Sequence, residues 1–183
     1  MTVDRRKLEV AACMILEAIG EEPFREGLKD TPKRFGKMWA EFIDYEPGTM
    51  DTVFESIHLD QMVAVSGVRV WSICEHHLLP FSCDLTIGYL TVKRVIGLSK
   101  MARIAHFHAH GLQCQERLVD EIATDMMGLT GSNHVAVIGR GNHLCMTMRG
   151  IRTPHIMVSS AMRGQFKDDP SLRSELLQLT KEN

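Results

Sequence analysis

The amino-acid sequence predicts an α+β fold in which an antiparallel sheet carries helices on one of its faces. The clearest strand covers residues 82–90, where apolar and polar side chains alternate with the period of two that a half-buried strand requires. Residues 98–130 instead show the apolar spacing of helices. The expected order is helices, two strands, two helices, two strands and a final helix. Such an order favours an antiparallel sheet covered on one side by helices.

The first 50 residues are expected to form an N-terminal helical arm, and residues 51–183 a single further unit. The apolar residues of the first helix recur at helical spacing before Gly20: Leu8, Ala11, Ala12, Ile15 and Ile19. Thr31 is a suitable N-cap for a second helix, because Pro32 then occupies the first helical position, where no N–H is needed. Residues 45–48 end that helix.

In the larger unit, residues 62–65 and 68–70 are expected to be strand segments separated by a break at residues 66–67. The buried face of the next strand is formed by Cys83, Leu85, Ile87 and Tyr89. Ser99 is expected to cap the first central helix, and a short join makes the second helix antiparallel to it. Strands are expected over residues 134–148, with a glycine interruption, and from residue 156. Asp169-Pro170 begins a last helix that ends near Leu179.

Composition restricts the class of protein. The chain has 183 residues, 44% of them hydrophobic, and a formal net charge of −2, so it can build a core but has no basic field for nucleic acid. Its five cysteines are an odd, scattered set, and no signal-peptide pattern precedes them, which predicts reduced thiols in the cytoplasm. No apolar run is long enough to span a membrane.

Two short clusters of thiols and imidazoles predict a metal site: Cys74-Glu75-His76-His77 and His143-Leu144-Cys145. Thiolate sulfur and imidazole nitrogen are the ligands that zinc prefers. A Cys-x-x-His pair with one distant cysteine gives three ligands and an open position, as in hydrolytic zinc centres. His143 and Cys145, two apart on an expected strand, would share a face. The alternative is that Cys145 is a core thiol and the histidines lie on the surface.

Basic residues at the start of the first central helix could form an anion site. Lys100 and Arg103 share a helix face beside Ser99, at an N-terminus that offers free N–H groups. Arg149 and Arg152 could extend this phosphate cradle. An ordinary solvated helix start explains the same residues equally well.

Two further groups are less specific. The carboxylate of Glu116, after Gln115, could accept two hydrogen bonds from adjacent N–H groups such as those on the Watson–Crick edge of guanine, but an exposed helix charge is the simpler interpretation of that residue alone. His106, His108 and His110 alternate along a helix, and a polar helix end is favoured over a metal site because no thiolate is near in sequence.

Taken together, these motifs resemble the GTP cyclohydrolase I family in order and spacing, from about residue 30 to about residue 177. The resemblance rests on residues 31–34, 74–77, 97–103, 115–118 and 143–150. It implies a T-fold, which is a four-stranded antiparallel sheet with two antiparallel helices on one face. It also implies a homodecamer with active sites between subunits, in which oligomerisation closes the sheets into barrels.

The activity that the resemblance implies is the conversion of GTP and water to 7,8-dihydroneopterin triphosphate and formate. Cys74, His77 and Cys145 match zinc (Zn²⁺) ligands. His76, His143 and Ser99 match catalytic positions, with His76 as the proton donor to the imidazole ring and His143 as an acid/base near the ribose. Residues that match contacts to the triphosphate and ribose are Ser99, Lys100, Arg103, Arg149 and Arg34, the last from a neighbouring subunit. Glu116, helped by Gln115, matches the carboxylate that reads guanine.

Two other interpretations compete with this one. A T-fold nitrile reductase acting on a deazaguanine would need a nucleophilic cysteine and a nicotinamide cofactor, which the intact set of Cys74, His77 and Cys145 argues against. A non-enzymatic zinc-stabilised module would close its metal with a fourth protein ligand, either His143 or His76.

Overall fold

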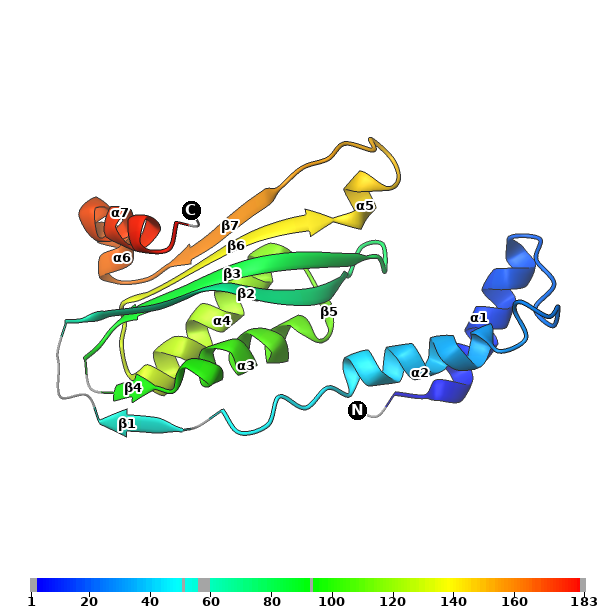
Figure 1. Cartoon of the computed structure of the whole chain (residues 1–183), viewed down its shortest axis with the longest axis horizontal. Coiled ribbons are helices and arrows are strands. Elements are labelled where there is room, and N and C mark those ends of the chain that lie inside the picture. The colour runs from blue at the N-terminus through cyan, green and yellow to red at the C-terminus, as the bar shows by residue number, and fades with distance from the viewer. Residues whose placement is uncertain (1–2, 51, 56–59, 93, 182–183) are drawn as a thin grey trace. The chain divides into compact units, whose positions relative to one another are not determined.

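The computed structural model describes residues 3–50, 52–55, 60–92 and 94–181 (Figure 1). The chain divides into two compact units, Met1–Glu46 and Pro47–Asn183. The larger unit contains every sheet of the described residues and every residue of the predicted metal site.

The smaller unit is a pair of helices, α1 (Arg5–Ala18) and α2 (Thr31–Ile43). The Asp4 side chain caps α1 by accepting a hydrogen bond from the Lys7 N–H at 3.1 Å. The N-cap of α2 is Asp30 rather than Thr31, a shift of one residue that leaves a proline in the first turn, as predicted. A Cβ at Gly36 would lie 2.9 Å from the Arg5 carbonyl oxygen, so a glycine is required where the two helices meet.

A five-stranded sheet in the order β5-β2-β3-β6-β7 forms the centre of the larger unit. Its four long strands are all antiparallel: β2 (Met62–Cys74), β3 (Pro80–Leu90), β6 (Val135–His143) and β7 (Met157–Met162). The sequence predicted only these. The structure adds β5 (Leu112–Gln113), which runs parallel to the end of β2, and a separate antiparallel pair, β1 (Val53–Glu55) with β4 (Arg94–Ile96). Two- and three-residue strands have too little periodicity to be seen in a sequence.

The break expected at residues 66–67 is instead a bulge within one continuous strand. The register of β2 against β3 shifts between Val65 and Val68, and Gly67 adopts a φ of 70°. A glycine with positive φ lets the strand take up the extra residues and continue.

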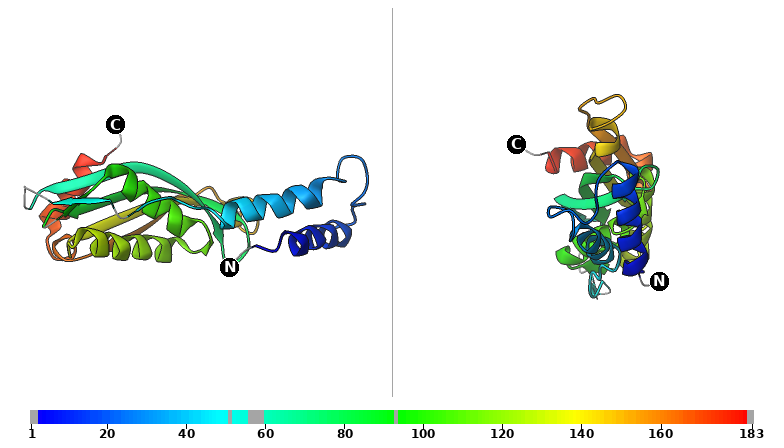
Figure 2. Two further views of the ribbon diagram at one scale, coloured as in Figure 1. Left: turned by 90° about the horizontal axis from the view of Figure 1, so that it is seen from below. Right: turned by 90° about the vertical axis from the view of Figure 1, so that its right-hand side faces the viewer.

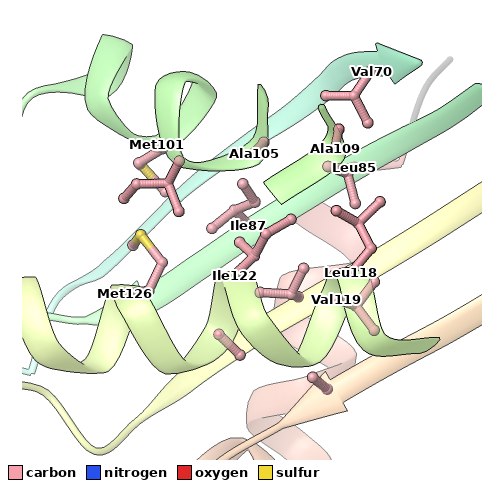
Figure 3. Close-up of a cluster of buried hydrophobic side chains, with 14 of the residues drawn as sticks. Val70, Leu85, Ile87, Met101, Ala105, Ala109, Leu118, Val119, Ile122 and Met126 are labelled. Atoms are coloured by element: carbon pink, nitrogen blue, oxygen red, sulfur yellow. The ribbon is translucent and has the colours of Figure 1, made fainter. Parts of the chain in front are cut away.

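Helices α3 (Leu98–Ala109) and α4 (Gln115–Thr130) lie side by side on one face of this sheet (Figure 2). The N-cap of α3 is Gly97, not the predicted Ser99, and α4 ends at Gly131 in the left-handed conformation. The strand face predicted to be buried is fully buried against these helices. The core between the layers is shown in Figure 3 and includes Val70, Leu85, Ile87, Met101, Leu118, Ile122 and Met126.

The opposite face of the sheet is partly covered by the C-terminal helices α6 (Gln165–Asp168) and α7 (Pro170–Leu179). The side chain of Asp169 caps α7, where the sequence predicted its start. Phe166 and Leu176 pack there in a second, smaller core with Leu90, Ala136 and Ile138. Helices therefore contact both faces of the sheet, whereas the sequence predicted helices on one. Among the described residues, no helix is both long enough and apolar enough to cross a membrane.

The second core can be tested with two neighbouring leucines of α7. Leu176 is fully buried, whereas Leu177 is 54% exposed. We expect Leu176→Ala to lower the free energy of unfolding by about 2–5 kcal/mol, because it removes packed methyl groups and leaves a cavity. Leu177→Ala is the matched control and should change it by less than about 0.5 kcal/mol. Urea denaturation measures both, and equal effects would contradict this packing.

Candidate metal centre and surrounding site

Three predicted metal ligands converge in the larger unit. One donor atom from each of Cys74, His77 and Cys145 lies within 4.8 Å of the other two. Cys74 ends β2, and a tight turn follows, in which the Leu78 N–H donates to the Cys74 carbonyl at 2.9 Å. Leu78 takes a left-handed φ of 54°. This turn folds the chain back, so that His77 Nδ1 lies 3.8 Å from Cys74 Sγ.

Cys145 reaches the group by a route that the sequence did not predict. Strand β6 ends at His143, and residues Leu144–Thr147 form a single helical turn, α5. The expected strand through residue 148 is therefore wrong, and so is the argument that His143 and Cys145 share a strand face. Thr147 Oγ1 lies 3.0 Å from the His143 carbonyl oxygen and 3.1 Å from Asn142 Oδ1, and a hydrogen bond to either acceptor ties the turn back to its start.

The donor set fits zinc. It consists of two sulfurs and one ring nitrogen, and His77 is exposed, so the cluster is open on one side. Burial and the neighbouring Cys74 raise the pKa of the Cys145 thiol. A bound cation would offset that cost, because metal ligation favours the thiolate. Cys83 differs, because it is fully buried in the core and burial raises its pKa to about 12, as suits an inert thiol.

His143 lies beside the three donors but outside their group. Its ring stacks on Phe81 with centroids 4.4 Å apart and planes 7° from parallel, and the ring of His155 is 6.1 Å away. Burial, and then the proximity of His155, lower the pKa of His143, while Glu116 raises it. His76 is exposed, with Nδ1 at 3.8 Å from Cys74 Sγ.

Gln115 holds His143 from inside the protein. Its side chain is fully buried, and its Nε2 donates to the carbonyls of Gly139 at 3.0 Å and Met157 at 3.1 Å, with Ser159 Oγ also 3.0 Å away. Gln115 Oε1 lies 3.0 Å from His143 Nε2. The side chain of Gln115 is thus engaged with the sheet and with His143 of the same chain. Glu116, the next residue, is exposed in the first turn of α4.

The predicted phosphate cradle lies at the opposite end of α3 from the metal cluster. Strand β5 follows the end of α3 and pairs with β2 at Cys74, so this end of the helix lies near the metal cluster. Twelve helical residues at a rise of 1.5 Å give α3 a length of about 18 Å, and the cradle begins at its other end. Lys100 Nζ donates to the Thr49 carbonyl at 2.9 Å, and Arg103 Nη1 to the Pro47 carbonyl at 2.7 Å.

The structure thus does not bring Ser99, Lys100 and Arg103 together with the cysteines of the same chain. Arg149 follows α5 and is exposed, and its charge acts to lower the pKa of Cys145. In the smaller unit, Arg34 faces Asp30 at 3.8 Å.

The histidines at the end of α3, two in the helix and His110 as its C-cap, make contacts within the helical layer. His106 and His110 have ring centroids 5.8 Å apart, as their spacing of four predicts. His108 lies 2.8 Å from Asp125 and 3.3 Å from Glu121, both on α4.

Sequence analysis missed Phe81, His155 and Arg117. Phe81 is the cross-strand partner of His143, and only the register of β3 against β6 reveals that pairing. Arg117 binds Glu75, 42 positions away, with Nη2 at 2.6 Å from Oε2. An isolated charge of each sign gives no signal at that separation.

Comparison with known proteins places the chain in a family. Residues 8–181 match the family model of GTP cyclohydrolase I. A protein of Hyperthermus butylicus named GTP cyclohydrolase 1 is 44% identical over 98% of this chain and 92% of its own length. Proteins of the same name from Sulfurihydrogenibium sp. and Aquifex aeolicus are 44% and 42% identical, over 98% and 99% of this chain and 96% and 99% of their own.

The chain belongs to the GTP cyclohydrolase I family and is therefore an enzyme. Among solved structures, the archaeosine synthase QueF-Like in the apo form aligns with 56% of this chain and 93% of its own length, at 14% identity and a TM-score of 0.47.

The contact between Gln115 and the sheet can be tested at Gly141. A Cβ at this position would overlap Gln115 Oε1. We expect Gly141→Ala to cost about 1–3 kcal/mol of unfolding free energy by overpacking. Combined with Gln115→Ala, it should cost clearly less than the sum of the two single variants, because the new methyl group fills vacated space. Urea unfolding of all three variants measures this coupling.

Gly128→Ala is the control for this cycle, because no atom lies within 4 Å of a Cβ there and the residue is helical. It should be neutral or stabilising by up to about 1 kcal/mol. Additivity of Gln115→Ala and Gly141→Ala within about 0.5 kcal/mol would contradict the contact.

Proposed function

We propose that this enzyme opens the imidazole ring of GTP hydrolytically with a zinc ion and yields formate and 7,8-dihydroneopterin triphosphate. The observation that supports it most is the convergence of Cys74, His77 and Cys145 in a chain whose relatives are named GTP cyclohydrolase 1. Two thiolates and one imidazole would hold zinc and leave its fourth position open. When bound, the ion would supply a Lewis acid that lowers the pKa of water toward ~7.

His76 and His143 are the acid/base groups of this proposal. Exposed on the metal turn, His76 can donate a proton to the opening ring. The tautomer of His143 follows from its partner: Gln115 Nε2 already donates to two carbonyls, so Oε1 faces His143 and accepts from its Nε2–H. In the neutral ring Nδ1 is then the free acceptor, which suits a group that takes up a proton near the ribose.

Glu116 would read the guanine base. It is exposed at the start of α4, next to the residue that holds His143, and its charge is felt at that histidine. A carboxylate can accept hydrogen bonds from both N–H groups on the Watson–Crick edge of guanine, and hydrogen bonds to a charged acceptor are strong. A base held there would place its imidazole ring toward the metal cluster.

The triphosphate would be held by a second copy of the chain. At a rise of 1.5 Å per residue, Ser99 and Lys100 lie roughly 14–15 Å, and Arg103 about 9 Å, along α3 from its metal end. The Lys100 and Arg103 side chains bind the Thr49 and Pro47 carbonyls of their own chain. A site between subunits would bring this cradle to the metal centre of another chain, with Arg149 on the metal side and Arg34 from a neighbour. Ser99 there would also be a catalytic residue.

The sheet supports such an assembly. Strand β7 is at one edge, and the short β5 covers only the end of β2 at the other, so both edges leave backbone groups for pairing with another chain. We propose that a homodecamer closes these T-fold sheets into barrels. The five cysteines are all unpaired, which suits a reducing cytoplasm.

The proposal is tested by measuring formate and dihydroneopterin triphosphate released from GTP by the purified protein. We expect both products in equal amounts, their loss on treatment with a zinc chelator, and their return when zinc is added. Absence of turnover by protein that demonstrably contains zinc would reject the proposed reaction.

Two variants separate a catalytic metal from a structural one within the same assay. Cys145→Ala should lose zinc and turnover together, whereas His143→Ala should keep zinc and fold and lose turnover. Loss of zinc from His143→Ala would show instead that His143 is a fourth protein ligand. Zinc content is measured by elemental analysis and fold by circular dichroism.

The guanine contact is tested with Glu116→Ala. We expect kcat/KM for GTP to fall roughly tenfold or more, because a hydrogen bond to a charged acceptor contributes about 1.5–3 kcal/mol. Glu175→Ala, an exposed change on α7, is the control and should leave kcat/KM unchanged. If Glu116→Ala binds and converts GTP as well as the unaltered chain, Glu116 does not read the base.

A further inference from the structure

Glu75 lies between the two predicted ligands of the metal turn and is anchored by a residue that the proposed reaction does not use. Its Oε2 accepts a hydrogen bond from Arg117 Nη2 at 2.6 Å. Glu75 is partly buried, whereas His76, His77 and Leu78, which follow it, are exposed. The ion pair therefore attaches an otherwise exposed turn to helix α4.

Arg117 also closes the junction between this turn and β5. Its Nη2 donates to the Leu112 carbonyl at 3.0 Å, and its Nε to Gln113 Oε1 at 2.6 Å. The Gln113 carbonyl in turn accepts from the Glu75 N–H at 3.1 Å. One planar guanidinium thus holds the turn, the strand beside it and the side chain between them, a geometry that the fixed donors of arginine allow and a lysine cannot reproduce.

The same junction is tied to both covering helices through Gln113, which is only 4% exposed. Its Nε2 donates to Glu121 Oε2 on α4 at 2.8 Å and to the His108 carbonyl on α3 at 3.3 Å. His108 also lies between Glu121 and Asp125. The position of the turn is therefore set by the helical layer, not by the exposed residues of the turn itself.

We propose that Arg117, acting through Glu75 and Gln113, is a positioning residue for the metal centre. It holds the turn from Cys74 to His77 in the conformation in which both side chains can meet Cys145. Ligands that are already in place lose little freedom when the ion binds, so the bridge should raise the affinity for zinc. This inference rests on the proposed zinc centre.

The experiment measures zinc affinity by competition with a chromophoric chelator, using the full chain and its variants. We expect Arg117→Ala to bind zinc roughly tenfold to a hundredfold more weakly, the usual cost of removing a residue that orients a metal ligand. Arg117→Lys should restore little of the zinc affinity, because lysine keeps the positive charge but lacks the several fixed N–H donors of the guanidinium. Arg69→Ala breaks the comparable Arg69–Asp84 pair, at 2.7 and 2.8 Å on the sheet, and should bind zinc normally.

The sign of the effect separates positioning from simple electrostatics. Removing a positive charge near the centre would by charge alone strengthen the binding of a cation, whereas removing the negative charge of Glu75 would weaken it. We expect both Arg117→Ala and Glu75→Gln to weaken binding, and the double variant to lose little more than either.

The possible failures are distinguishable. If the unaltered chain binds no zinc, the proposed metal centre is rejected, and the positioning role of Arg117 is rejected with it. If the unaltered chain binds zinc and the folded Arg117→Ala variant binds it equally well or more tightly, only the positioning role is overturned. Should Arg117→Ala not fold by circular dichroism, the nearly isosteric Glu75→Gln decides, and normal zinc affinity in that variant overturns the role.

Discussion

The antiparallel pairing of β3 with β6 is the contact on which the site depends. It places Phe81 opposite His143, so the chain segment that follows β6 starts beside the turn that precedes β3. The two motifs, Cys74–His77 and His143–Cys145, are nearly seventy positions apart and meet only through this register. A slip of one residue would turn His143 away from Phe81, because the side chains of a strand alternate between its faces. The hydrophobic face of β3 opposes such a slip, since Leu85 and Ile87 would leave the core.

The helical layer adds a second constraint, which acts on side chains rather than on strands. Helix α4 begins beside the site, and three consecutive residues of its first turn make different contacts. Gln115 points into the sheet and holds His143, Glu116 is exposed, and Arg117 reaches Glu75. Successive helical residues point about 100° apart, so one turn can serve the core, the solvent and the metal turn together. Burial of Leu118 and Ile122 one and two turns further on fixes the rotation of the helix.

The parts of this arrangement that repeat with a regular period could be predicted from the sequence. The alternation in residues 82–90 identified a buried strand face, and the Cys-x-x-His pair with a distant cysteine identified three residues that do converge. The parts that depend on a single contact could not. Helical turn α5 interrupts an apolar stretch that reads as strand, and Gln115 is indistinguishable in sequence from a surface residue at a helix start. The ion pair between Arg117 and Glu75 forms because the two-residue strand β5, which precedes α4, pairs with the end of β2, which precedes Glu75.

On the proposed function, the length of α3 separates the metal ligands from the residues proposed to bind the triphosphate. All three metal donors, and the residues that hold them, come from one chain and one unit, so their geometry needs no partner. Lys100 and Arg103 lie roughly 14 and 9 Å along α3 from its metal end, and they bind the carbonyls of residues 49 and 47 of the same chain. On the proposed function, a single chain would therefore hold zinc yet lack a place for the triphosphate. Turnover would depend on protein concentration through assembly, whereas zinc affinity would not, because mass action affects only the step that joins subunits.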